Sequence, residues 1–159
     1  MKNQKVTVRY QFSPVGFIRR DEGSVSIEIV PVYKPALKEL ETFSHAQVFW
    51  WFSEFDDESS RQTTQFDKMP FAAPPLGVFS CRSPMRPNPI GLTTVKILDV
   101  DHDQGSIKIA DMDAYDGTPV LDIKAYMPHC DRVKEVQVPE WAAGWPDWLP
   151  ENGLGLEDK

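Results

Sequence analysis

The sequence predicts a mainly β protein: a single small, largely antiparallel β-barrel with one short helix and an irregular Trp- and Pro-rich C-terminal tail. Polar and apolar residues alternate with a period of two in segments rich in Val, Ile, Thr and aromatic residues, which is typical of strands. Turn residues separate these segments with little helical sequence between them, so neighbouring strands should pair antiparallel. The alternating segments are 5–12, 24–30, 46–55, 91–100, 106–112 and 119–126.

The connections between the predicted strands are short and rich in Asp and Gly. The stretch "DHDQG" (101–105) joins two alternating segments and predicts a β-hairpin. The helix is expected over 34–45, because Pro35 suits a first turn and Leu37, Leu40, Glu41 and Ser44 fall on one face at three- and four-residue spacing.

The chain reads as one barrel domain followed by a tail. Its 159 residues are 41% hydrophobic, enough for a single core without metal or disulfide support. We expect residues 1–138 to form the barrel domain and 139–159 an irregular tail packed on it, with Trp141, Trp145 and Trp148 docking on the body.

Charge and cysteine content exclude several classes of protein. A net charge of −7 argues against general nucleic-acid binding through phosphate contacts, so a nucleic-acid partner would need a local basic patch. No segment has the apolar length of a membrane span, and the N-terminus lacks a signal-peptide core, so we expect a cytoplasmic protein. Cys81 and Cys130 lie far apart without a second ligand cluster, so we expect neither a disulfide nor a metal site.

The segment "CRSPMRPNPIG" (81–91) predicts a rigid loop between two strands. Its prolines remove three backbone donors and exclude a helix or a central strand. From the residues alone, three interpretations stay open: a loop that closes a barrel end, a PxxP ligand for a partner, or a working loop of an enzyme. As a working loop it would present Arg82, Arg86 and Asn88 together.

A second polar stretch, 111–128, carries four carboxylates. Asp116 and Gly117 suit a plain β-turn, in which Asp bonds backbone amides and Gly takes a positive φ. Asp113 ends an apolar segment directly before that turn, which makes it a better candidate for a functional acid than Asp122 within a strand.

Two long segments resemble the signature blocks of a known family. "GVFSCRSPMRPNPIGLTTVKIL" (77–98) and "DAYDGTPVLDIKAYMP" (113–128) are similar to blocks of the YaeB-like family, also described as TrmO-like or TsaA-like; "LETFSHAQVFWWF" (40–52) and "VGFIRR" (15–20) match less closely. The resemblance implies a small β-barrel that uses S-adenosylmethionine to methylate threonylcarbamoyladenosine in tRNA. It also implies a homodimer with the active site near the subunit interface.

Carried over by position, the resemblance implies site residues of two kinds. Phe55 and Leu92 would line an adenine slot, Arg82 would meet the cofactor carboxylate, and Asp113 or Glu54 would meet its ribose hydroxyls or ammonium. The full implied cofactor set is Glu54, Phe55, Arg82, Leu92, Ala110, Asp111, Met112 and Asp113. The residues implied near the acceptor are Arg86, Asn88, Asp116 and Tyr126.

Individual roles follow from side-chain chemistry. Asn88 and Tyr126 would hydrogen-bond the acceptor, and Asp116 would fix its loop or receive the released proton.

The sequence departs from the family around these blocks. The loop after "VGFIRR" is shorter, and 59–75 replaces an arginine-rich segment, so charge for binding phosphates is missing there. A divergent short paralogue is therefore also consistent with the sequence. It would methylate a small acceptor other than tRNA, or bind the cofactor as a non-catalytic sensor.

Overall fold

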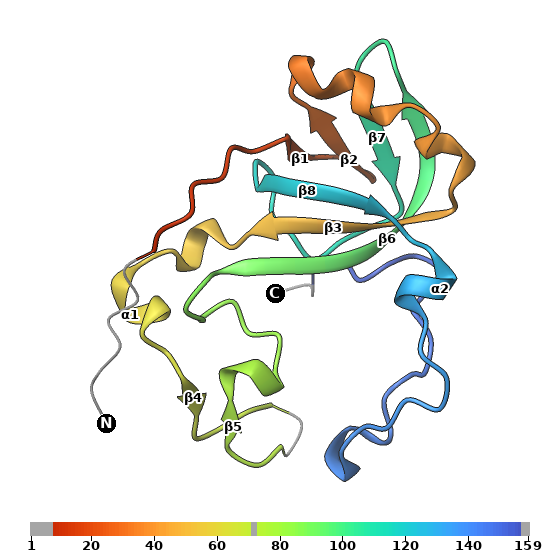
Figure 1. Cartoon of the computed structure of the whole chain (residues 1–159). Coiled ribbons are helices and arrows are strands. Elements are labelled where there is room, and N and C mark those ends of the chain that lie inside the picture. Colours follow the sequence, from red (N-terminus) through yellow and green to blue (C-terminus); the bar gives the residue numbers. More distant parts are fainter. Residues whose placement is uncertain (1–7, 71–72, 157–159) are drawn as a thin grey trace.

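The computed structural model describes residues 8–70 and 73–156. Six strands close into an antiparallel barrel in the spatial order β1-β2-β7-β6-β3-β8 (Figure 1). The predicted fold class, a mainly antiparallel β-barrel, is confirmed. The barrel strands are β1 (Gly16–Asp21), β2 (Ser24–Ile29), β3 (His45–Trp51), β6 (Ile90–Asp101), β7 (Ser106–Ile109) and β8 (Pro119–Ala125).

Alternation along the strands fills the barrel interior with β-branched residues. Ile18, Ile27, Val48, Val95 and Ile107 come from five different strands and are each at most 1% exposed. Burial of each such side chain contributes about 1.5–3 kcal/mol. One packed core therefore fixes the ends of the strands, where the loops of the site begin.

Hairpins join β1 to β2 and β6 to β7. The predicted turn at 101–105 is confirmed: Gly105 has a φ of 74°, its N–H donates to the Asp101 carbonyl at 2.8 Å, and the Gln104 N–H donates to the Asp101 carboxylate. The expected strand over 5–12 is wrong in its described part, because residues 8–12 lie in no strand; residues 5–7 lie outside the described residues.

The expected helix over 34–45 is also wrong. The chain forms two short 3-10 segments, η1 (Pro31–Leu37) and η2 (Leu40–Thr42), that together still bury Leu37. Lys38 has a ψ of 127° and Glu39 a φ of 68°, so a continuous α-helix cannot run through these two positions.

The remaining elements are one turn long or form a two-stranded sheet outside the barrel. The helices are η3 (Ser53–Phe55), α1 (Glu58–Arg61), η4 (Val78–Ser80), α2 (Pro128–Asp131) and η5 (Glu140–Ala142), and the small sheet pairs β4 (Gln65–Phe66) with β5 (Leu76–Gly77). In residues 8–70 and 73–156, no helix is long and apolar enough to span a bilayer.

Two segments extend from the barrel, one bearing α1, β4 and β5 and the other following α2 (Figure 1). In the second, the rings of Trp141 and Trp145 meet edge to face at 5.5 Å, and Arg132 lies over Trp148 at 5.5 Å. Trp148 is 73% exposed, so its ring does not dock on the barrel as expected. A domain boundary at residue 138 stays a prediction.

Candidate functional site

Two cavities of about 350 Å³ each lie at the barrel end where β3 finishes and β6 begins. Both are lined by Trp50, Phe52, Arg82 and Asp113, so they are adjacent and share one wall. This wall carries one cationic and one anionic side chain. Pockets that bind small molecules commonly have volumes of about 300–1,000 Å³, so each cavity is large enough for a ligand.

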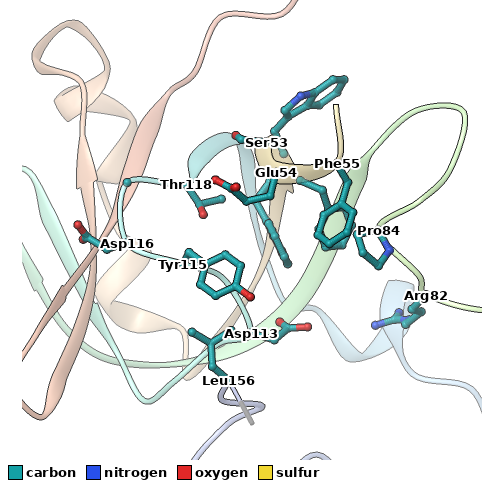
Figure 2. Close-up of a pocket in the computed structure, with 14 residues that line it drawn as sticks. Ser53, Glu54, Phe55, Arg82, Pro84, Asp113, Tyr115, Asp116, Thr118 and Leu156 are labelled. Carbon is teal, nitrogen blue, oxygen red and sulfur yellow. The ribbon is translucent and has the colours of Figure 1, made fainter. Parts of the chain in front are cut away.

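The first, the aromatic cavity, is enclosed by large apolar side chains with acids between them (Figure 2). The segment η3 follows directly after β3 and brings its residues over the barrel end. Apart from the shared wall, the aromatic cavity is lined by Trp51, Ser53, Glu54, Phe55, Pro84, Tyr115, Asp116, Gly117, Thr118 and Leu156.

The second, the polar cavity, lies against the proline-rich loop of residues 81–89. Its lining is richer in hydrogen-bonding groups, which suits a polar ligand. Apart from the shared wall, the polar cavity is lined by Phe79, Cys81, Arg86, Asn88, Ile90, Gly91 and Leu92.

Arg86 braces the proline-rich loop from within. Its guanidinium donates to the carbonyls of Val78, Cys81 and Ser83 at 3.3–3.4 Å. Because prolines cannot supply backbone donors, this one side chain replaces part of the missing hydrogen bonding. Asn88 remains exposed on the braced loop and lines the polar cavity.

Arg61 of α1 clamps the same loop from outside. It donates to the Pro87 carbonyl at 3.1 Å, pairs with Asp56 at 2.5 Å, and lies 5.4 Å from the ring centre of Trp51. Hydrogen bonds from Arg61 and from the Trp51 indole lower the pKa of Asp56, so its carboxylate stays ionised at neutral pH and keeps the ion pair intact.

Arg20 of β1 organises the loop between β7 and β8. Its guanidinium donates to the carbonyls of Ala114 and Met112 and pairs with Asp111 at 2.9 Å, while its backbone N–H donates to Asp116 at 2.9 Å. The loop is thus fixed to the barrel on both sides of Asp113.

Eight of the twelve implied site residues line the two cavities. Glu54, Phe55 and Asp116 line the aromatic cavity, Leu92, Arg86 and Asn88 the polar cavity, and Arg82 and Asp113 both. Arg82 is further held by a 3.2 Å hydrogen bond to the Leu92 carbonyl.

The other four line neither cavity. Ala110 donates its N–H to the Lys96 carbonyl, Asp111 pairs with Arg20, and Met112 is fully buried. Tyr126 follows β8 at the end away from Asp116, where its N–H donates to the His45 carbonyl. Their assignment to the site stays a prediction.

Several residues that line the site or hold its side chains were absent from the sequence-based set: Trp50, Tyr115, Leu156, Arg20, and Thr93, whose hydroxyl donates to Asp113. Tyr115 lies within the matched block 113–128, which was a usable signal. Trp50 and Thr93 carried the signature of core positions, inward-facing residues of alternating strands. Among residues 8–70 and 73–156, no three His, Cys, Asp or Glu side chains gather as metal ligands would.

Comparison with known proteins identifies the family of the domain that contains both loops. The model of the tRNA-methyltransferase O N-terminal domain family matches residues 13–132. The chain belongs to this family. This domain covers the barrel and both cavities except for Leu156.

Individual relatives agree with the family match. An S-adenosyl-L-methionine-binding protein of Archaeoglobus fulgidus is 39% identical over 75% of this chain and 81% of its own length. The tRNA (adenine(37)-N6)-methyltransferase of Escherichia coli is 31% identical over 79% of this chain. The crystal structure of TrmO from Pseudomonas aeruginosa superposes with a TM-score of 0.63 at 28% identity over 82% of this chain.

The chain matches only part of several of these proteins. It spans 61% of the length of the E. coli enzyme, 61% of the P. aeruginosa TrmO chain, and 31% of a second relative from A. fulgidus.

Proposed function

We propose that this chain binds S-adenosylmethionine and transfers its methyl group to N6 of adenosine 37 of tRNA, in the threonylcarbamoyl-modified form. The observation that carries the proposal is the meeting of two cavities at Arg82 and Asp113, within a domain whose relatives are named for this cofactor and for this tRNA position. One cavity is available for each of the two reactants.

The chemistry of the aromatic cavity fits the cofactor. Phe55 and Tyr115 offer ring faces to a purine, and Glu54 offers acceptors to ribose hydroxyls. Arg82 and Asp113 carry the two charges that complement an amino-acid carboxylate and ammonium. The cofactor's amino-acid end would therefore lie at the shared wall.

The polar cavity is then the place for the acceptor. When bound, S-adenosylmethionine supplies an electrophilic methyl group on a sulfonium that is its own leaving group. The protein's task is to orient the acceptor amine and to let its proton leave. Asn88 is an exposed hydrogen-bonding group of the polar cavity, apart from the shared wall, on a loop braced by Arg86 and clamped by Arg61. We therefore assign Asn88 to the acceptor amine and Arg86 to loop rigidity.

Asp116 has a supporting role in this proposal. Its carboxylate accepts the backbone N–H of Arg20 at 2.9 Å, which favours fixing the loop over taking a proton. Homodimer formation and a cytoplasmic location remain part of the proposal. Light scattering on the purified protein tests the dimer.

Methyl transfer from labelled cofactor tests the function. The protein is incubated with tritiated S-adenosylmethionine and total tRNA from a strain that lacks this modification, and the labelled nucleoside is identified. We expect label in threonylcarbamoyladenosine. Binding without transfer to tRNA or to a small-molecule extract would instead support the sensor module, and label confined to the small-molecule extract would support a non-tRNA acceptor.

Arg82→Ala provides the matched variant. It removes a charged partner of the cofactor carboxylate, so we expect cofactor affinity to fall by about 1.5–3 kcal/mol. Arg19→Ala is the control, because Arg19 lies on β1, pairs with Glu28 and lines neither cavity. Equal affinities of the two variants would contradict the assignment of Arg82.

A further inference from the structure

A buried hydrogen-bond chain ends on the acid of the shared wall. The indole N–H of Trp50 donates to the Thr93 hydroxyl at 3.1 Å, and that hydroxyl donates to Oδ1 of Asp113 at 2.6 Å. Trp50 is 4% exposed and Thr93 is 1% exposed, whereas Asp113 is exposed and lines both cavities. One core residue is therefore hydrogen-bonded to a group that faces ligand space, and a second core residue is connected to that group through the first.

The direction of this chain follows from the chemistry of its members. An indole N–H can only donate, so the Thr93 oxygen must accept it. Thr93 then has one proton left, and a buried hydroxyl proton needs an acceptor. Asp113 supplies that acceptor through Oδ1. Within residues 8–70 and 73–156, its Oδ2 has no hydrogen-bond or ion-pair partner, so it remains available to a ligand.

The pairing of β3 with β6 holds the hydrogen-bond chain in place. Trp50 lies opposite Gly91 in the β3–β6 ladder, and Thr93 lies opposite Val48. A Cβ atom at Gly91 would lie only 2.3 Å from the Trp50 indole, so the ring occupies space that a side chain would otherwise fill. Trp50 and Thr93 lie on paired strands of the closed barrel, so the Thr93 hydroxyl has a fixed position from which it donates to Asp113 and favours one orientation of that carboxylate.

Arg82 lies on the same wall but is held separately. It donates to the Leu92 carbonyl at 3.2 Å, and among the described residues it forms no ion pair with Asp113. The two opposite charges are thus fixed by the protein and do not neutralise each other. A zwitterionic ligand would complement both without breaking an internal ion pair.

We propose that Thr93, oriented by Trp50, is a positioning residue that fixes Asp113 so that its free oxygen binds the ammonium group at the amino-acid end of S-adenosylmethionine. The inference rests on the proposed function. It adds that the affinity of the site for the amino-acid end depends on a core hydroxyl that touches no ligand.

Calorimetric titration with two ligands tests this role. S-adenosylhomocysteine carries the ammonium and the carboxylate, whereas 5′-methylthioadenosine carries the nucleoside without either. We expect Thr93→Val to weaken S-adenosylhomocysteine about tenfold or more, because the hydrogen bond that orients the carboxylate is lost, and to leave 5′-methylthioadenosine within about twofold. Thr93→Ser keeps the hydroxyl and should restore the affinity.

Thr94→Val is the matched control. Thr94 is the next residue of β6, lies on its alternate face and lines neither cavity. Thermal unfolding checks that each variant folds, and Thr93→Ala replaces Thr93→Val if the valine variant does not.

The outcomes separate the inference from the proposed function. If Thr93→Val weakened the binding of both ligands equally, or changed neither affinity, the positioning role would be overturned. Binding of the ligands by the wild-type protein would still support the cofactor site. A wild-type protein that binds neither ligand would overturn the proposed function and the positioning role with it.

Discussion

A methyl group added at Gly91 should destabilise the barrel at the shared wall of the cavities. The Cβ of Gly91→Ala would lie 2.3 Å from Cε2 and 2.6 Å from Cδ2 of Trp50. The indole is rigid and 4% exposed, so it must shift as a unit and lose its 3.1 Å hydrogen bond to Thr93. Overpacking costs about 1–3 kcal/mol, and a lost buried hydrogen bond adds about 1 kcal/mol. We expect the free energy of unfolding to fall by about 2–4 kcal/mol.

Urea unfolding at pH 7, followed by circular dichroism, measures this loss. Gly144→Ala is the control, because a Cβ at Gly144 meets nothing within 4 Å and its φ is not positive. That variant should change the free energy of unfolding by less than about 1 kcal/mol. If Gly91→Ala proved as stable as Gly144→Ala, the indole would not be confined and the reasoning about the shared wall would fail.

Two further predictions concern α1 and the loop that it holds. Arg61→Ala removes the 3.1 Å hydrogen bond to the Pro87 carbonyl, so the rate of methyl transfer should fall about tenfold. Arg19→Ala is the control and should keep the wild-type rate. An unchanged rate in Arg61→Ala would show that Arg61 does not hold the loop. Hydrogen bonds from Ser59 and Ser60 lower the pKa of Asp57. Its stabilising effect is therefore complete above the unfolded pKa of about 3.9 and is lost as the pH falls through the lower folded value. Asp57→Ala should lower the urea midpoint at pH 7 but progressively less below pH 4, and a constant difference would contradict this.

Strands could be predicted from the sequence where alternating side chains point into the barrel interior. β6 and β8 agree with the predicted segments 91–100 and 119–126 to within one residue at each end. Alternation does not report whether a neighbouring strand exists, however. Val8, Tyr10 and Phe12 alternate with polar residues, yet each is more than half exposed and pairs with no strand.

The failed helix has a different cause. Helical spacing of Leu37 and Leu40 is also produced by two successive 3-10 segments. The helix is interrupted at Lys38, which has a ψ of 127°, and at Glu39, which has a positive φ, and neither residue type gives a local signal for such a conformation.

Site residues could be predicted where they lie together in one loop. They could not be predicted where their role depends on contacts with strands that are distant in the sequence. Arg82 and Asp113 lie in matched blocks, and both line the cavities. Asp111 has the same side chain as Asp113 but is paired with Arg20, 91 positions earlier. Thr93 looks like an ordinary core residue until Trp50, 43 positions earlier, is placed beside it. Such pairings are set by barrel closure, which no local pattern encodes.

The return of the tail to the cavity has a practical consequence for ligand measurements. A Cβ at Gly155 would lie 2.3 Å from the Asp111 carboxylate, so the chain passes close over that loop, and the next residue, Leu156, lines the aromatic cavity. Only three residues, 157–159, separate Leu156 from a purification tag joined after Lys159. A tag at this end would therefore follow closely after a residue of the cavity lining, so affinities should be measured after a C-terminal tag has been removed.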